Sequence, residues 1–500
     1  MSDRAPAVSP VVSVVLVVPL APAPDGNGLA MRAGMWLEAL ASHARVHVVV
    51  VPVAGPAAPL EWAAALAADA VVVEPEWSPS TESVVAQLAE PALRERLTRT
   101  SPLPVLARAV PATLAVAAET ALGPARAAPT SVVTMRSYLA PFGITLAHRL
   151  HAANVVVDLD DDDEQLLRDR GDGEEADAYG RLARAWLPDA DVLVAASPGE
   201  ATALTARYGL RAVETVPNAV RLPGSITAAP GQARVLFVGN LTYAPNVDAA
   251  RLLADEVLPL LRDRVPDATV DLVGRHDDRL ADLAGRTGIR LTGHVPDVAP
   301  YYSAADVVVA PLREGAGTRI KVLEAFAYGR AVVATPAAVA GLAVVDGQSV
   351  LLGDDPTTLA DRAASVLTEP QLARRLVAEA SRVVREHYVL DVVGPQARRV
   401  VFGEQNRGQR RVGDVSTERP QPASGIDVHE VEDGFVVFDA GTDRVHYLNP
   451  TATVVFSLCD GTRTPSEIAE LVRSAWDLDA APVDDVVECI AQLRDEGVLR

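Results

Sequence analysis

Short valine-rich runs alternate with helix-forming segments along most of this 500-residue chain. Runs that are apolar throughout are typical of strands buried within a parallel sheet. The segments between them are rich in alanine, leucine and arginine, so the pattern predicts parallel strands joined by crossover helices. In the first block the expected strands are Val12–Val18, Val46–Val53, Ala70–Val73, Ser131–Thr134, Asn154–Asp158 and Asp191–Ala195.

The alternation stops at residues 214–219, and a Pro/Gly/Ala-rich segment at 222–233 indicates a hinge. It then resumes with expected strands at Arg234–Gly239, Ala268–Gly274, Ile289–Gly293, Asp306–Pro311, Ala331–Ala334 and Val350–Leu352. We therefore predict an α/β fold with two facing doubly wound Rossmann-like domains, residues 1–222 and 223–385, and a helix at 386–402 that returns to the first domain. Such sheets bind ligands at the carboxyl ends of their strands, so the active site is expected in the cleft between the domains.

Composition and charge limit the function classes. With 49% apolar residues, the chain has enough core for more than one domain. A net charge of −21 argues against nucleic-acid or anionic-membrane binding over the whole surface. The two cysteines, Cys459 and Cys489, offer neither a disulfide framework nor metal-ligand spacing. The apolar run Val14–Leu20 with its flanks is too short to span a bilayer. A secretory signal at 11–23 is the alternative, but the run continues as a first strand would, so we expect a cytoplasmic protein with no integral membrane segment.

Lys321 is the only lysine among the 45 basic Lys and Arg residues. It follows a Gly-rich turn that separates a strand-like run from a helix pattern, and backbone N–H groups of such a turn point toward a bound anion. An ammonium on a flexible stem suits a phosphate that shifts during a reaction. We interpret the segment as a phosphate cradle; the alternative is a coding bias toward arginine that spared one lysine by chance.

The second block resembles the nucleotide-sugar-binding domain of GT-B glycosyltransferases of the retaining group 1 (family 4) type. In that domain the resemblance rests on Phe237–Ala250, Val273–His276, Gly293–Asp297 with Tyr301 and Tyr302, and Gly315–Glu324. In the first block the match is looser and rests on Asp25–Gly28 before Arg32, Asp189–Val192 before Ser197, and Val216–Asn218. Together these motifs cover residues 11 to about 402. The resemblance implies metal-independent transfer of a sugar from a nucleotide sugar, with no cofactor.

The same resemblance assigns the site. Lys321, Arg275 and Arg319 are the catalytic candidates, because they would stabilise the charge that develops on the departing diphosphate. Glu324 would accept hydroxyls of the nucleotide ribose. The remaining expected donor contacts are Glu314, Gly315, Ala316, Gly317, Thr318, Asn240, Gly26, Asn27 and Gly28. The alternatives are surface arginines paired with acids such as Asp277, a helix-surface acid, and ordinary loops.

One position departs from the family. Group 1 enzymes commonly carry two glutamates eight positions apart in this loop, and Glu324 is the second, whereas Ala316 occupies the place of the first. Glu314 lies two residues further out and is a possible substitute.

The acidic run at 158–164 is a candidate metal site, since clustered carboxylates suit hard cations. We instead interpret it as the end of a strand followed by a helix start, where acids favour the positive end of the helix dipole. His151, His276 and His294 are single residues at strand or turn edges and are expected to be structural.

The C-terminal part differs in kind. Residues 403–425 show no apolar period and predict a flexible linker. Residues 426–500 predict three strands followed by three helices that begin near Pro450, Pro465 and Pro482. This segment resembles the PqqD-like family of small winged-helix α+β domains, through Tyr447–Ala452, Asp460–Thr464, Glu467–Ala469 and Leu493–Leu499.

The PqqD-like resemblance implies a leader-bearing precursor peptide as a partner. An exposed strand edge accepts an extended peptide as an added strand. The expected peptide-binding residues are Val445, His446, Tyr447 and Leu448.

The combined hypothesis is a glycosyltransferase that modifies a ribosomally made peptide recruited by its own small domain, with a nucleotide sugar as the other partner. One alternative is a transferase of surface polysaccharide or glycolipid synthesis. Another is a catalytically inactive GT-B scaffold that binds peptides.

Overall fold

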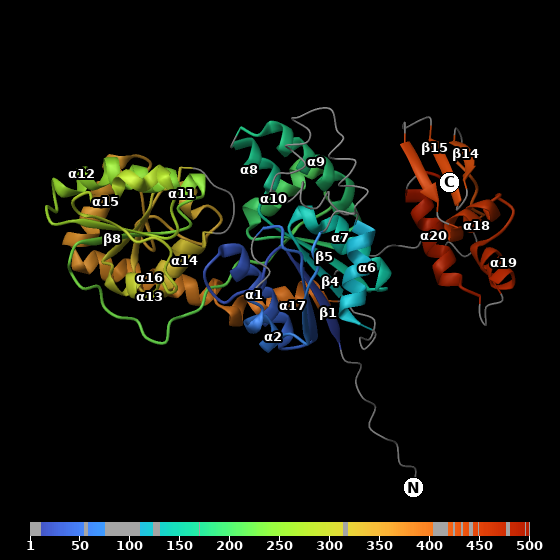
Figure 1. Ribbon diagram of the computed structural model, residues 1–500, viewed down its shortest axis with the longest axis horizontal. Helices are drawn as coiled ribbons and strands as arrows, with labels where there is room; N and C mark the ends of the chain where they lie inside the picture. The colour runs from blue at the N-terminus through green and yellow to red at the C-terminus, as the bar shows by residue number, and fades with distance from the viewer. Residues whose placement is uncertain are drawn as a thin grey trace, which may run out of the picture. The chain divides into compact units, whose positions relative to one another are not determined.

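The computed structural model describes residues 12–54, 59–75, 111–123, 131–169, 171–313, 319–403, 419–423, 426–431, 434–439, 444–448, 450–476, 481–495 and 497–499. The chain divides into two compact units, 1–406 and 407–500, and the first contains both α/β domains (Figure 1). No helix among the described residues is long and apolar enough to cross a membrane.

The first α/β domain is built on a parallel sheet in the order β3-β2-β1-β4-β5-β6-β7. Its strands are β1 Ser13–Val18, β2 Arg45–Val50, β3 Asp69–Val72, β4 Ser131–Met135, β5 Asn154–Asp160, β6 Val192–Ala195 and β7 Glu214–Thr215. Its helices are α1 Gly28–Ala41, α2 Glu61–Leu66, α6 Pro111–Leu122, η1 Ser137–Leu139, α7 Ala140–Arg149, α8 Asp163–Asp169, α9 Gly173–Trp186, η2 Leu187–Asp189, α10 Pro198–Tyr208 and, from the end of the unit, α17 Leu390–Phe402.

Strand β1 shows why the valine runs form this sheet. Val14, Leu16 and Val18 pack in one core cluster with residues of α1 and α17, whereas Val15 and Val17 pack in another with α6 and α7. Successive side chains of a strand point to opposite faces, so a strand with helices on both faces must be apolar throughout.

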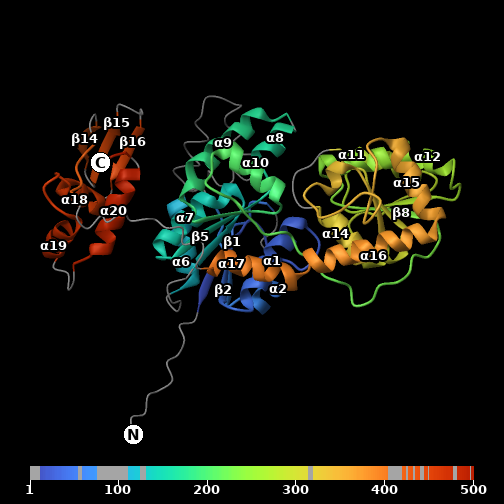
Figure 2. The ribbon, with the colours of Figure 1, turned by 180° about the vertical axis from the view of Figure 1, so that it is seen from behind.

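Helix α17 closes the first unit by returning to this domain. It lies beside α1 in both views (Figures 1 and 2). The Val401 carbonyl accepts hydrogen bonds from Ser131 Oγ and Asn154 Nδ2, each at 3.1 Å. The helix expected at 386–402 ends at Phe402 but begins later, at Leu390, because α16 continues to His387.

The second α/β domain has the sheet order β10-β9-β8-β11-β12-β13, again parallel. Its strands are β8 Arg234–Val238, β9 Thr269–Val273, β10 Ile289–Leu291, β11 Val307–Ala310, β12 Ala331–Ala334 and β13 Leu351–Leu352. Its helices are α11 Ala244–Leu252, η3 Leu253–Val257, α12 Leu258–Arg262, η4 Asp278–Leu283, α13 Ala299–Ala304, α14 Ile320–Ala327, η5 Pro336–Val339, α15 Pro356–Thr368 and α16 Pro370–His387. Figure 1 shows α11, α12 and α15 on one side of β8 and α13, α14 and α16 on the other. Both sheets reverse their strand order once, which confirms the expected doubly wound architecture.

Three glycines bring the strand ends together in the second domain. Gly239 donates its N–H to the Val273 carbonyl at 3.0 Å, and Gly274 donates to Gly293 at 3.1 Å. Gly274 has φ +141°, and a Cβ there would lie 1.8 Å from the Gly239 carbonyl oxygen. Only glycine permits this approach, which holds the loops after β8 and β9 side by side.

The second unit is an α+β domain with its own core. Strands β14 Ile426–Val431, β15 Gly434–Asp439 and β16 Arg444–Leu448 form an antiparallel sheet in that order. Helices α18 Pro450–Leu458, α19 Pro465–Trp476 and α20 Val483–Asp495 follow, and their apolar side chains form a core cluster with Val437 and Leu448.

The C-terminal end of the expected linker belongs to this unit. Ala423 donates its N–H to Val498 at 3.0 Å, Gly461 donates to Pro420 at 2.9 Å, and Pro422 forms a bridge with Leu499. The linker expected over 403–425 is therefore wrong for residues 420–423, because their backbone pairs with the domain.

A buried ion pair ties the first domain together. Arg32 of α1 donates from Nε and Nη2 to the two Asp158 carboxylate oxygens, both at 2.6 Å, and Trp36 donates to the same carboxylate at 2.7 Å. The third guanidinium nitrogen of Arg32 donates to the Val216 carbonyl at 3.1 Å. Strand β5, helix α1 and the segment that leaves the domain are thus joined through one side chain.

We predict that Asp158→Ala destabilises the first unit by about 3–5 kcal/mol, because it leaves the buried Arg32 guanidinium without its counter-charge. Urea unfolding followed by circular dichroism measures the loss. The control is Arg382→Ala, which removes an exposed pair with Glu379 and Glu386 on α16 and should change stability little. Equal midpoints for the parent and the Asp158 variant would contradict the structural role of this pair.

Candidate functional site

Lys321 lies in the first turn of α14, at the switch point between β8 and β11. Its ammonium donates to Asn246 Oδ1 at 2.9 Å and lies 5.6 Å from the centroid of the Phe237 ring. Burial lowers the pKa of Lys321 to about 8; Arg319 lowers it further, and Glu324 opposes both effects. The group therefore sits near its titration point at physiological pH, as is common at functional sites.

Glu324 follows Lys321 by three positions, on the same face of α14. Its carboxylate accepts a hydrogen bond from the Tyr302 hydroxyl at 3.2 Å, and the Tyr302 ring stacks on Tyr328 with centroids 4.8 Å apart. Burial raises the pKa of Glu324 to about 7, whereas the Tyr302 hydrogen bond and Lys321 lower it; Asp25 of the first domain adds a smaller upward effect.

Arg319 precedes α14 and lies at the interface with the first domain. Burial lowers the pKa of Arg319, while the charges of Asp161 and Glu200, both in the first domain, oppose that effect. Next to it, Ile320 Cδ1 lies 3.4 Å from where a Gly28 Cβ would stand. The glycine loop of the first domain therefore meets the start of α14.

That glycine loop is set by its own backbone. Gly26 has φ +91°, and Asn27 caps α1 by accepting the Leu29 N–H at 2.9 Å. Gly26, Asn27 and Gly28 are exposed, so their backbone is accessible next to α14.

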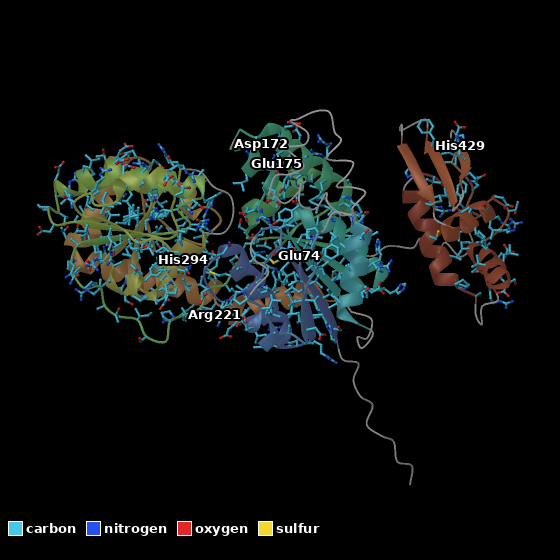
Figure 3. The ribbon with its side chains drawn as sticks, in the orientation of Figure 1. Glu74, Asp172, Glu175, Arg221, His294 and His429 are labelled. Atoms are coloured by element: carbon cyan, nitrogen blue, oxygen red, sulfur yellow. The ribbon has the colours of Figure 1, made fainter. Side chains whose placement is uncertain are left out.

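Some expected site residues lie apart from these groups. Arg275 is exposed, and Asp277 pairs with Arg279 at 2.7 Å rather than with Arg275. Asn240 is exposed, and its Oδ1 accepts hydrogen bonds from the backbone N–H and the hydroxyl of Thr242. His294 is also exposed (Figure 3). The remaining expected donor contacts, Glu314, Gly315, Ala316, Gly317 and Thr318, lie outside the described residues.

The acidic run at 158–164, which begins at the end of β5, has partners that the sequence interpretation missed. Strand β5 continues to Asp160, and Arg136 at the end of β4 pairs with Asp160 at 3.1 Å, with Asp161 at 2.9 Å and with Asp163. Ser137 also donates to Asp163, at 2.9 Å. Only the last acids of the run occupy the first turn of α8, so the helix dipole explains only part of it. The sequence signal that could have predicted this contact is Arg136, directly after β4. Strands β4 and β5 are parallel neighbours, so their carboxyl ends lie at the same edge of the sheet.

Arg136 and Asp160 also carry unusual backbone conformations, with φ of 72° and 56°. Burial, with the nearby Asp161 charge, raises the pKa of Asp160 to about 7, and Arg32 and Arg136 oppose this. Among the residues that the structure describes, no group of three or more His, Cys, Asp or Glu side chains is arranged to hold a metal ion.

The expected peptide-binding residues Val445, His446, Tyr447 and Leu448 all lie in β16. Of these, Leu448 is buried in the core and His446 is half-buried. Strand β16 pairs with β15 on one side, and in the sheet order β14-β15-β16 it is an edge strand.

Two sequence families match parts of the chain. The family described as Glycosyl transferases group 1 matches residues 232–369. The family described as Coenzyme PQQ synthesis protein D (PqqD) matches residues 434–499. The chain thus contains a group 1 glycosyltransferase domain and a PqqD domain.

Curated relatives cover part of the chain. A phosphatidyl-myo-inositol mannosyltransferase of Mycolicibacterium smegmatis is 35% identical over 207 residues, which are 38% of this chain and 52% of that protein. The Mycobacterium tuberculosis protein of the same name is 35% identical over 209 residues, 38% of this chain and 54% of that protein. The chain therefore spans about half the length of these relatives.

Solved structures show the fold. HepE of Anabaena, in complex with UDP and glucose, superposes with a TM-score of 0.54 at 14% identity, over 76% of this chain and 97% of HepE. Sucrose-phosphate synthase of Thermosynechococcus elongatus gives 0.54 at 17% identity, over 77% and 97%. The α/β part has the GT-B-like fold of glycosyltransferases.

The raised pKa of Glu324 yields a stability prediction. Unfolded, the carboxyl loses its proton near 4.5, but in the folded protein it does so only near 7, so the folded state loses stability as pH rises between these values. Glu324→Gln removes this dependence. Between about pH 5 and about pH 8 the parent should therefore lose about 2–3 kcal/mol relative to the variant.

Urea unfolding of both proteins at the two pH values measures this difference, and titrating groups that do not interact with Glu324 cancel in the comparison. Parallel pH dependences would mean that Glu324 titrates normally in the folded protein.

Proposed function

We propose that this protein is a retaining, metal-independent glycosyltransferase that moves a sugar from a nucleotide sugar to a ribosomally made precursor peptide. The observation that carries this proposal is the pair of half-buried, oppositely charged groups on α14, Lys321 and Glu324, at the switch point of the second sheet. Ligands of doubly wound sheets bind at this position. The match to group 1 glycosyltransferases over residues 232–369 supports the donor class.

The proposed roles follow the charges of the residues: the cations would bind the diphosphate and the carboxylate would bind the ribose. The departing nucleoside diphosphate gains negative charge as the glycosidic bond to the phosphate breaks, and the Lys321 ammonium, with Arg319, would stabilise it. Both cations are half-buried, and their attraction for an anion is stronger there than in bulk water. Glu324 would accept ribose hydroxyls, a task that needs its ionised form and so favours pH above about 7.

The PqqD domain supports a peptide acceptor. Strand β16 offers an edge on which a leader peptide could add a strand. Residues 426–500 hold 16 Asp and Glu against 5 Arg, a net charge of −11, so a partly basic leader would be favoured. The small domain and the transferase domains belong to one chain, and such tethering gives an effective concentration on the order of millimolar. We place the reaction in the cytoplasm, where nucleotide sugars and precursor peptides are made.

A second candidate is sugar transfer to a surface polysaccharide or glycolipid. It is favoured by the 35% identity to the phosphatidyl-myo-inositol mannosyltransferases. An inactive peptide-binding scaffold is suggested by Ala316 at the family's glutamate position, but Lys321 and Glu324 are both present.

Lys321→Ala should lower the rate of donor hydrolysis or transfer by about 100- to 1,000-fold, because a preorganised cation at the leaving group is lost. The fold should survive, as judged by circular dichroism and thermal melting. Lys321→Arg should also be impaired, since a planar guanidinium differs from an ammonium in reach and geometry. Release of the nucleoside diphosphate from a panel of nucleotide sugars is the readout, and near-parental turnover of the alanine variant would rule out the assignment.

Cutting the chain after Ser416 separates the two units upstream of the docked segment 419–423. Residues 1–416 should retain donor hydrolysis, and residues 417–500 should bind the leader peptide with salt-sensitive affinity. Modification of the full precursor should fall roughly 100-fold and recover only partly when the small unit is added in trans. A truncated enzyme that modifies its acceptor as fast as the intact protein would favour the polysaccharide or glycolipid alternative.

A further inference from the structure

We propose that Asn246 is a positioning residue that aims the Lys321 ammonium and keeps it protonated without neutralising it. This inference rests on the proposed donor site. Asn246 belongs to α11, on a different element from the groups assigned to the donor, and it is buried.

Both ends of the Asn246 amide are engaged. Nδ2 donates to the Asn240 carbonyl at 2.9 Å, and Oδ1 accepts from Lys321 Nζ at 2.9 Å. A carbonyl only accepts hydrogen bonds, so the NH₂ group must face Asn240. The oxygen must then face the ammonium, and the orientation of the amide follows from its two partners.

The surroundings hold this amide in place. A Cβ at Gly239 would lie 3.0 Å from Nδ2 and 3.2 Å from Cγ of Asn246, so the absence of a side chain at Gly239 allows the close approach. The carbonyl-bearing residue Asn240 is itself held in a turn closed by Thr242. On the β8 side, the Phe237 ring faces the ammonium at 5.6 Å.

The charges around Lys321 explain why a neutral acceptor is needed. Burial has the largest effect and lowers the pKa of Lys321 to about 8. Of the charged groups near it in the chain, Arg319 also lowers this pKa and Glu324 raises it. From α11 and β8 the contacts are uncharged: the Asn246 oxygen and the Phe237 ring. A hydrogen bond to the charged form raises the pKa. An aspartate at the same place would do so too, but it would compete with the donor diphosphate for the ammonium.

The single lysine makes the inference directly measurable. Biosynthetic labelling with lysine carrying ¹³C at Cε gives one side-chain signal, whose shift from about pH 6 to about pH 11 reports the pKa of Lys321 alone. We expect Asn246→Asp to raise this pKa by about one unit or more, and Asn246→Ser and Asn246→Leu to lower it, the latter more strongly.

The matched control is Asp248→Asn. Asp248 lies two residues from Asn246 on the same helix and pairs with Arg313. The substitution removes a full charge but leaves the contact between Asn246 and Lys321 unchanged. The lysine signal should titrate as in the parent. An unchanged pKa in all three Asn246 variants, with the native fold confirmed by circular dichroism, would reduce Asn246 to a packing residue and overturn the inference.

Calorimetric titration with UDP and GDP tests the link to the donor. Asn246→Asp should weaken nucleoside diphosphate binding about tenfold or more despite its higher lysine pKa, because the carboxylate pairs with the ammonium. Asn246→Leu should lose more affinity at about pH 8.5 than at about pH 6.5, as less of its lysine is charged. Parental affinity in Asn246→Asp would overturn the inference. A parent protein that releases a nucleoside diphosphate from none of the panel of nucleotide sugars would instead overturn the proposed function, and the lysine titration distinguishes the two failures.

Discussion

The bidentate pair between Arg32 and Asp158 is the contact on which the arrangement of the first unit depends. It fixes α1 to the middle of the first sheet and, through the Val216 carbonyl, to the point where the chain leaves that domain. Four residues after Val216, the Val220 N–H donates to the Tyr388 carbonyl at 2.7 Å. This hydrogen bond joins the segment that leaves the first domain to the segment that returns to it. The glycine loop at the start of α1 meets Ile320 of the second domain. By fixing α1, the Arg32–Asp158 pair therefore also fixes the position at which the two domains approach each other.

The site on α14 uses charge differently. Arginine forms short, paired contacts at Asp158 and at Asp160 and Asp161, as suits its planar fork. Lys321 and Glu324 instead have pKa values moved toward neutrality by burial, and each partly compensates the other. Charged groups held away from water cost stability, and this cost is typical of sites where a ligand later supplies the missing charge.

Much of the fold followed from local pattern. The valine runs predicted both sheets, since strands covered on both faces need no polar alternation, and the observed strands fall within a few residues of the expected ones, except β7 Glu214–Thr215, which the sequence did not predict. The boundaries were less accurate: α16 extends to His387, and 419–423 pairs with the small unit. Both errors arise because helix ends and linker ends are decided by contacts with distant segments.

The sequence by itself determined the strand and helix alternation, the unique lysine and the acid that follows it by one helical turn, because these depend on residue type and short spacing. Only the tertiary structure decided the partners: Asp158 with Arg32, Arg136 with the acidic run, and Asn246 with Lys321. It also placed Arg275 and Asn240 on the surface. Asn246 and Lys321, which are 75 positions apart in the chain, meet only where the carboxyl ends of parallel strands converge, and no local pattern encodes which side chains reach each other there.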